Sequence, residues 1–269
     1  MNASIRPAAV AGMFYPGRAE ELAADVAAML AAVVPSDAPA SPKALIVPHA
    51  GYIYSGTVAA SAYALLAPLR GKVRRVVLLG PTHRVALRGI AVPSVDGFAT
   101  PLGVVRVDRS AIATLAGLPQ VGISDEAHAR EHSLEVHLPF LQSVLGDFML
   151  VPLAVGYVAP EEVAAVIDRL WGGDETLIVV SSDLSHYHAY ERARKIDRAT
   201  ADRIVALEPL EDHEQACGAT PVNGLIAVAR RRGLSPTLLD LRNSGDTAGD
   251  RSRVVGYCSV AFTEDRHDR

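Results

Sequence analysis

Residues 44–49 read ALIVPH, residues 76–83 read VVLLGPTH, and residues 177–186 read LIVVSSDLSH. In each stretch, a short run of mostly branched apolar residues ends in a polar cluster that carries a histidine. Such runs, bounded by Gly, Pro or Ser, are typical of strands buried on both faces of a parallel sheet. Ligands of open α/β sheets bind outside the carboxyl ends of the strands. We therefore expect the three polar clusters to meet at one edge of the sheet and to outline a metal or catalytic site.

Hydrophobic periodicity predicts the elements around these runs. Helices are expected at 19–33, 57–67, 131–145, 160–171, 191–207, 211–216 and 221–232, and further strands near 148–155, 236–241 and 253–262. Residues 121–130 are expected to form a loop. Thr220 is expected to cap the last helix, with Pro221 in its first turn. Pro139 complicates the helix at 131–145, because an interior proline kinks or ends a helix. The alternating pattern predicts an α/β protein, a three-layer α/β/α sandwich around a mostly parallel mixed sheet.

The composition indicates a self-sufficient soluble domain. A chain of 269 residues with 49% hydrophobic content can bury a large core, and no stretch is a convincing linker, so residues 1–269 are interpreted as a single domain. The phosphate-binding loops GxGxxG and GxxxxGK[ST] are absent from the sequence. The net charge is −4, and the basic triplet 230–232 falls at a predicted helix end, where it complements the helix dipole. Nucleic acid is therefore not an expected partner.

Cysteine usage and hydropathy bear on the compartment. Two cysteines in a chain of this length give no disulfide framework, which suits a reducing cytosol. The apolar stretch after Arg6 is too short and broken for a signal peptide, and no apolar run approaches the ~20 residues of a membrane span. We expect a cytoplasmic protein that does not enter a membrane.

Three residues are candidates for metal binding. His49 and His83 each follow a predicted strand directly. One histidine in such a place is as often structural as functional, but two favour a shared site. Cys217 precedes a predicted helix N-terminus, whose dipole favours thiolate, although a cysteine in an Ala-rich segment is usually just buried. Cys258 lies in a run that alternates like a core strand and is interpreted as structural.

Two further pairs of residues could take part in the chemistry. Asp183 and His186 lie three apart beyond a strand end, where a carboxylate can set the tautomer and basicity of an imidazole, so they are the candidate acid/base pair. His132 and Glu135 would share one face of a helix at 131–145. They form either part of a pocket wall or a capping network, and their spacing does not fit the HExxH zinc pattern. The role of the neighbouring His137 stays open.

Several motifs together closely resemble the Memo family. They are RPAAVAGMFYP at 6–16, PHAGYIYSG at 48–56, GPTH at 80–83, EHSLEVHLP at 131–139, SSDLSH at 181–186, CG at 217–218 with Pro221 and Gly224 beyond it, and GDTAGDRSRVVGY at 245–257. The resemblance spans nearly the whole chain, with the motifs in the right order. The Memo family is similar in fold to the class III extradiol ring-cleaving dioxygenases, which are non-haem iron enzymes with an α/β/α sandwich.

The resemblance implies roles for the candidate residues. His49, His83 and Cys217 match the metal-ligand positions, His186 matches the acid/base histidine of the dioxygenases, and Asp183 lines the same pocket. Prokaryotic members resemble the middle partner of a trio with AMMECR-type and radical-SAM proteins, which are therefore candidate partners.

The third ligand position departs from the dioxygenases. Those enzymes hold Fe(II) with two histidines and a carboxylate, which leaves a face open for catechol and dioxygen. A thiolate from Cys217 favours Cu(I) and Zn and can itself be oxidised, so we expect a poor catechol dioxygenase. Glu214, one helical turn before Cys217, could supply a carboxylate instead, but the family motif does not support it.

Three functions are compatible with these residues. The first is a metal-dependent oxidoreductase that acts on a small, for example phenolic, substrate, with iron(II) or copper as its single metal ion and His186 moving a proton. The second is a non-catalytic protein that binds a metal or a partner. The third is a zinc hydrolase in which the three ligands leave one position for water. The sequence does not separate the first two.

Overall fold

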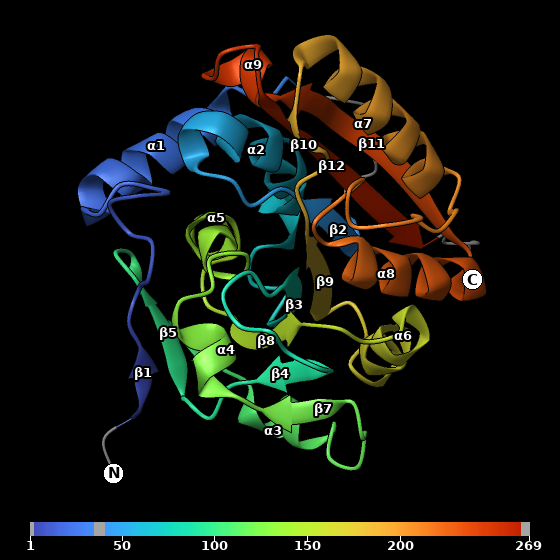
Figure 1. Cartoon of the computed structure of the whole chain (residues 1–269). Coiled ribbons are helices and arrows are strands. Elements are labelled where there is room, and N and C mark those ends of the chain that lie inside the picture. Colours follow the sequence, from blue (N-terminus) through green and yellow to red (C-terminus); the bar gives the residue numbers. More distant parts are fainter. Residues whose placement is uncertain (1–2, 35–40, 265–269) are drawn as a thin grey trace.

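A mixed β-sheet runs through the molecule with helices on both of its faces (Figure 1). The computed structural model describes residues 3–34 and 41–264. Its strands are β1 (Ile5–Arg6), β2 (Ala44–Val47), β3 (Arg75–Pro81), β4 (Ile90–Val92), β5 (Gly97–Thr100), β6 (Gly103–Val107), β7 (Val121–Ile123), β8 (Met149–Val155), β9 (Thr176–Ser181), β10 (His186–His188), β11 (Leu234–Asn243) and β12 (Val254–Glu264). Its helices are α1 (Ala19–Ala31), α2 (Thr57–Tyr63), α3 (Arg109–Ala113), α4 (Asp125–Ala129), α5 (Leu138–Leu145), α6 (Pro160–Arg169), α7 (Tyr190–Val205), α8 (Ala219–Arg232) and α9 (Ser244–Thr247), with a π-helical turn η1 (Tyr52–Gly56) and the 3₁₀ turns η2 (Ala64–Leu69) and η3 (Glu135–His137).

The three apolar runs are neighbours at the centre of the sheet. The strand order is β1-β5-β6-β8-β3-β9-β2-β12-β10, and β6, β8, β3, β9 and β2 are parallel. The antiparallel pairs are β5 with β6, β4 with β8, and β12 with β2, β10 and β11. Because β2, β9 and β3 are adjacent and parallel, the residues that follow them emerge at the same edge. The predicted arrangement of these runs is confirmed.

Each central strand is apolar on both faces, which explains its unbroken apolar run. Successive side chains of a strand point to opposite faces. In β3, Val76 and Leu78 face the core beneath α1, α2 and α5, whereas Val77 and Leu79 face the core beneath α6 and α8. All four side chains are fully buried, and burial of each is worth about 1.5–3 kcal/mol. The predicted α/β/α sandwich around a mixed sheet is confirmed.

Two expectations around residues 121–145 are wrong. Residues 121–130 are not a loop, because Val121–Ile123 pairs with β4 and Ser124 caps α4 by accepting a hydrogen bond from the backbone N–H of Ala127. The helix expected at 131–145 begins as an α-helix only at Leu138, with Pro139 in its first turn, where the missing N–H costs nothing. His132 and Glu135 therefore do not share a helical face.

Two further expectations fail next to Cys217. Residues 211–216 form turns rather than a helix, because Asp212 Oδ1 accepts hydrogen bonds from the backbone N–H groups of Glu214 and Gln215. Helix α8 begins at Ala219 with Gly218 as its N-cap, so Thr220 lies inside the first turn and does not cap it. Pro221 lies in the first turn as predicted.

None of the helices in residues 3–34 and 41–264 is long and apolar enough to cross a bilayer.

Candidate metal centre

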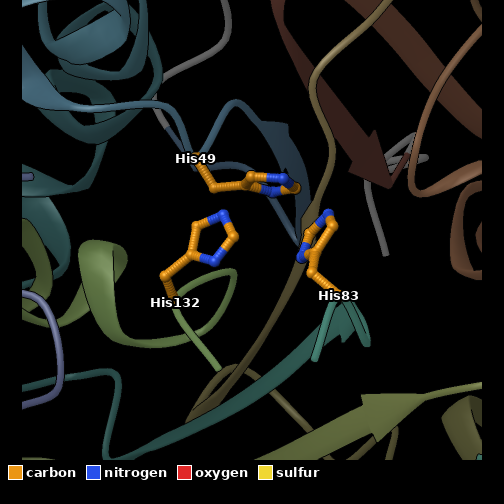
Figure 2. A group of neighbouring side chains, drawn as sticks. All are labelled: His49, His83 and His132. Atoms are coloured by element: carbon orange, nitrogen blue, oxygen red, sulfur yellow. The ribbon is translucent and has the colours of Figure 1, made fainter. Parts of the chain in front are cut away.

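Three histidines converge at the carboxyl edge of the central strands. His49 follows β2, His83 follows β3, and His132 lies in the loop between α4 and η3. One ring nitrogen from each residue can be chosen so that all three lie within 4.8 Å of one another. Figure 2 shows the three rings turned toward a common space. The centroid of the His83 ring lies 4.6 Å from that of His132 and 5.1 Å from that of His49. The sequence predicted His49 and His83 for this site and left the role of His132 undecided.

The histidines line a cavity of about 700 Å³. Asp183 and His186 line the same cavity, so all four of the strand-end residues predicted to meet do so. Its walls also carry the aromatic side chains of Phe14, Tyr54, Tyr187 and Tyr257. A cavity of this size, with polar groups at one place and aromatic walls, suits a small organic molecule.

Burial keeps His49 and His132 neutral. It lowers the pKa of His49 well below the ordinary 6.5, and the neighbouring histidines add to the effect. Burial likewise lowers the pKa of His132 to about 4. Neutral imidazoles retain a lone pair, which is the form that binds a metal ion.

Glu131, which the sequence analysis did not single out, organises this cluster. Its carboxylate accepts a hydrogen bond from Nδ1 of His83 at 2.9 Å, and others from the backbone N–H groups of His83, His132 and Ser133. Burial alone would raise the pKa of Glu131, but the hydrogen bonds from His83 and Ser133, with a favourable electrostatic interaction with the His83 ring, outweigh it and hold that pKa at about 2. A carboxylate bound to one nitrogen of an imidazole fixes the ring and leaves the other nitrogen for an ion.

Cys217 lies against His49. Its Sγ atom is 3.3 Å from His49 Nε2. Within the part of the chain that the structure describes, Cys217 is not in the group whose ligand atoms all lie within 4.8 Å. Burial, with a contribution from Asp183, raises the pKa of its thiol to about 12. The position before α8 therefore does not produce a thiolate by itself, and a bound cation would have to displace the proton.

Asp183 and His186 stand beside the histidine cluster. Asp183 Oδ1 accepts a hydrogen bond from the backbone N–H of His49 at 2.7 Å, and burial raises the pKa of this carboxyl to about 7. Burial lowers the pKa of His186. A carboxyl group with a pKa near 7 can both give and take a proton at neutral pH. The acid/base role of the pair stays a prediction.

The remaining candidates lie elsewhere. Glu214 is exposed and is not in the histidine group, and Cys258 is buried in β12 as expected. Glu135 is not among the residues that line the cavity and binds the N-terminal segment, whose Arg6 guanidinium donates to it at 2.6 Å. Of the pair His132 and Glu135, only His132 lines the pocket, and Glu135 binds the N-terminal segment, a role that neither alternative described.

The donor atoms fit a transition-metal ion. Two ligands of one tetrahedral ion, with bonds of ~2.0–2.3 Å, lie ~3.3–3.6 Å apart. The 3.3 Å separation of Cys217 Sγ and His49 Nε2 meets this spacing, and imidazole nitrogens within 4.8 Å of one another would have to approach by at most about 1.5 Å. Among the described residues, the buried Nδ1 of His132 has no hydrogen-bond partner, although Glu131 Oε1 lies 3.3 Å away. An unsatisfied buried nitrogen at this place is consistent with an ion site.

Comparisons with known proteins agree with the resemblance seen in the motifs. The family described as Memo-like protein matches residues 6–261. A MEMO1 family protein of Aquifex aeolicus is 38% identical, over 96% of this chain and 99% of its own length. One from Ignicoccus hospitalis is also 38% identical, over 96% of this chain and 98% of its own length. The crystal structure of an uncharacterized Escherichia coli K12 protein shares the fold, with a TM-score of 0.50 and 13% identity over 82% of this chain and 99% of that one.

Proposed function

The chain belongs to the Memo-like protein family, and we propose that it binds one metal ion through His49, His83 and Cys217 and acts with it on a small molecule in the adjoining cavity. The observation that carries the proposal is the cluster of three histidines at a cavity of about 700 Å³, with a thiol 3.3 Å from one of their nitrogens. Because burial keeps His49 neutral, it needs no proton removed before it binds an ion, whereas the thiol of Cys217 must ionise.

His132 is the competing third ligand. Its nitrogen belongs to the group within 4.8 Å, whereas Cys217 is close to His49. The test is the metal content of two variants. Cys217→Ser should lose most of its metal with the fold intact, because a neutral hydroxyl is a poor substitute for thiolate. His132→Gln should keep most of it. The reverse result would make His132 the third ligand and our assignment wrong.

We propose iron(II) or copper as the ion. Imidazole suits iron, copper and zinc, and thiolate favours Cu(I) and Zn. A bound redox metal would supply electron transfer or activation of a substrate oxygen, and zinc would supply a Lewis acid. Metal analysis of protein purified without oxygen separates the functions: iron supports an oxidoreductase, copper supports a metal-binding protein, and stoichiometric zinc supports a hydrolase.

Two residues that line the cavity would transfer protons to and from the substrate. His186 is proposed as the group that moves a proton, and Asp183 as its companion in the pocket, because both line the cavity. His186→Ala should then retain the metal while a proton-dependent reaction slows by ~10²–10⁴-fold. A metal-free variant would show instead that His186 is a ligand.

Ring cleavage of catechols is expected to be poor. The thiolate of Cys217 replaces the hard carboxylate of a facial triad, which alters both the open positions and the potential of iron. The test is to load the protein with Fe(II) without oxygen, add catechols, admit O₂ and follow the yellow ring-opened product. Rapid turnover by the wild type would contradict this expectation, whereas ring opening gained by Cys217→Glu would support it.

A further inference from the structure

A buried chain of hydrogen bonds runs behind His49, on the side away from the cavity. It joins groups from α2, η3 and the end of β9. Its contacts are Tyr63 Oη to His137 Nδ1 at 2.7 Å, His137 Nε2 to Ser181 Oγ at 2.8 Å, His49 Nδ1 to Ser181 Oγ at 2.6 Å, and Ser181 Oγ to the Ser133 carbonyl at 2.6 Å. Each residue that takes part in these hydrogen bonds is at most 2% exposed.

The hydrogens of this chain can be assigned from the chemistry of its members. The carbonyl of Ser133 can only accept, so the single hydroxyl hydrogen of Ser181 must lie on that contact. Ser181 Oγ then has only lone pairs left, and both imidazoles must donate to it. His49 therefore carries its hydrogen on Nδ1, and His137 carries its hydrogen on Nε2.

The far end of the chain agrees with this assignment. With its hydrogen on Nε2, neutral His137 has an accepting Nδ1, and the hydroxyl of Tyr63 donates to it. Every donor thus meets an acceptor without a charged imidazole. The chain ends at Tyr63, which is fully buried, so it does not lead a proton to solvent. Its effect is to fix hydrogens in place.

We infer that Ser181, held by His137 and Tyr63, is a positioning residue that selects the tautomer of His49 and so keeps Nε2 of His49 bare. Nε2 is the nitrogen that faces Cys217 Sγ, at 3.3 Å. A neutral imidazole has one hydrogen, and the wrong tautomer would place it on the nitrogen that must bind the ion. The tautomer of His49 follows from the hydrogen bonds alone. The inference rests on the proposed function only for the use of the bare nitrogen, which is to bind the ion.

Glu131 and Ser181 perform this task in different ways. Glu131 is a carboxylate, which can only accept from Nδ1 of His83. Ser181 is a hydroxyl, which could donate or accept, and the Ser133 carbonyl commits it to accepting from His49 because that carbonyl takes its only hydrogen. His137, which the sequence analysis left without a role, donates to the other lone pair of Ser181 and helps to hold that hydroxyl in place.

The test is Ser181→Ala, with Ser259→Ala as the matched control. Ser259 is also fully buried, and its hydroxyl donates at 2.6 Å to the carbonyl of Val58 in another part of the core. The tautomer of His49 is read in the metal-free proteins from long-range ¹H–¹⁵N NMR spectra of the histidine rings, with the signal assigned through His49→Gln. Zn²⁺ affinity is then measured by competition with a chelator.

The wild type and Ser259→Ala should both show His49 with its hydrogen on Nδ1. Ser181→Ala should lose that single tautomer and bind Zn²⁺ about 10–100-fold more weakly. A hydrogen on Nε2 in the wild type, or an unchanged tautomer in Ser181→Ala, would overturn the inference. Failure of the wild type to bind any metal would instead count against the proposed function, while the NMR spectrum still decides the tautomer.

A second pair of variants keeps the test decisive if Ser181→Ala does not fold. His137→Gln retains a donor and an acceptor in the side chain, whereas His137→Leu retains neither. In both variants the Ser133 carbonyl still takes the hydroxyl hydrogen of Ser181, so we expect His49 to carry its hydrogen on Nδ1 in both. A tautomer of His49 that changes in His137→Leu but not in His137→Gln would show that His137, and not the Ser133 carbonyl, commits Ser181, and would overturn the assignment.

Discussion

Glu131 and Glu135 lie four residues apart in one motif, and their surroundings divide the molecule into two regions. Both side chains are at most 1% exposed. Glu131 binds the ring of His83 and three backbone N–H groups at the histidine cluster. Glu135 binds Arg6, the hydroxyl of Tyr15 and the backbone N–H groups of Ala9 and Val10. One carboxylate orients candidate ligands, and the other fastens the N-terminal segment to the core.

The comparison teaches that residue type and motif do not set the role of a buried carboxylate. Its partners do, because a buried charge must be compensated by whichever donors the fold brings to it. The two regions nevertheless meet at one place. The segment held by Glu135 carries Phe14 into the cavity wall, where its ring centroid lies 4.8 Å from that of His132.

Removal of Glu135 should have the largest effect, and it should be an effect on stability. Glu135→Ala leaves Arg6 buried without its anion, so we expect the free energy of unfolding to fall by about 3–5 kcal/mol. Urea unfolding measures this fall. Glu21→Ala, which breaks the exposed pair with Arg18, should change little. Zn²⁺ affinity of the folded Glu135→Ala protein should stay near that of the wild type, and a parallel loss of affinity would erase the distinction between the two carboxylates.

Replacement of Glu131 should act mainly on the metal. In Glu131→Gln a neutral amide replaces the carboxylate that accepts the hydrogen bond from His83 Nδ1. The His83 ring is then held less firmly, and Zn²⁺ should bind about 10–100-fold more weakly. Competition with a chelator measures the affinity, and urea unfolding of the same sample gives the accompanying loss of stability. We expect that loss to be smaller than the loss in Glu135→Ala. Unchanged Zn²⁺ affinity would show that Glu131 is only structural.

Mild acid should weaken the Glu135 region through His128, the smallest effect of the three. The carbonyl of His128 accepts from Arg6, and burial, with a smaller contribution from the Arg6 charge, lowers the pKa of its ring to about 4. In the unfolded protein His128 has its ordinary pKa of 6.5, so it binds a proton at a higher pH than it does in the folded protein. Its contribution to the free energy of unfolding is therefore fully present above pH 6.5 and is lost as the pH falls toward 4.

The slope from this one proton is at most about 1.4 kcal/mol per pH unit. Other buried histidines titrate as well, so the measurement is a difference between proteins. Unfolding of metal-free His128→Gln should depend less steeply on pH between 6.5 and 4.5 than unfolding of the wild type. Equal slopes would mean that protonation of His128 does not contribute to the loss of stability in acid.

The sequence predicted the elements that carry strong local signals. The central strands are four to seven residues of nearly unbroken apolar character, and α1, α6 and α7 show a clear helical period. The strands β4 to β7 were missed because they are three to five residues long and interrupted by Gly and Pro, and their stability comes from partners distant in sequence.

By itself, the sequence determined the apolar core of the sheet, the placement of His49, His83, Asp183 and His186 at one edge, and membership of a family through its motifs. Only the tertiary structure decided what surrounds them. His132 enters the cluster from the loop between α4 and η3, and Glu131, Ser181 and His137 take their roles from contacts that span 44 residues or more. Spacing along the chain limits which residues can share an element, but a donor finds its acceptor only when the packed layers bring the two together.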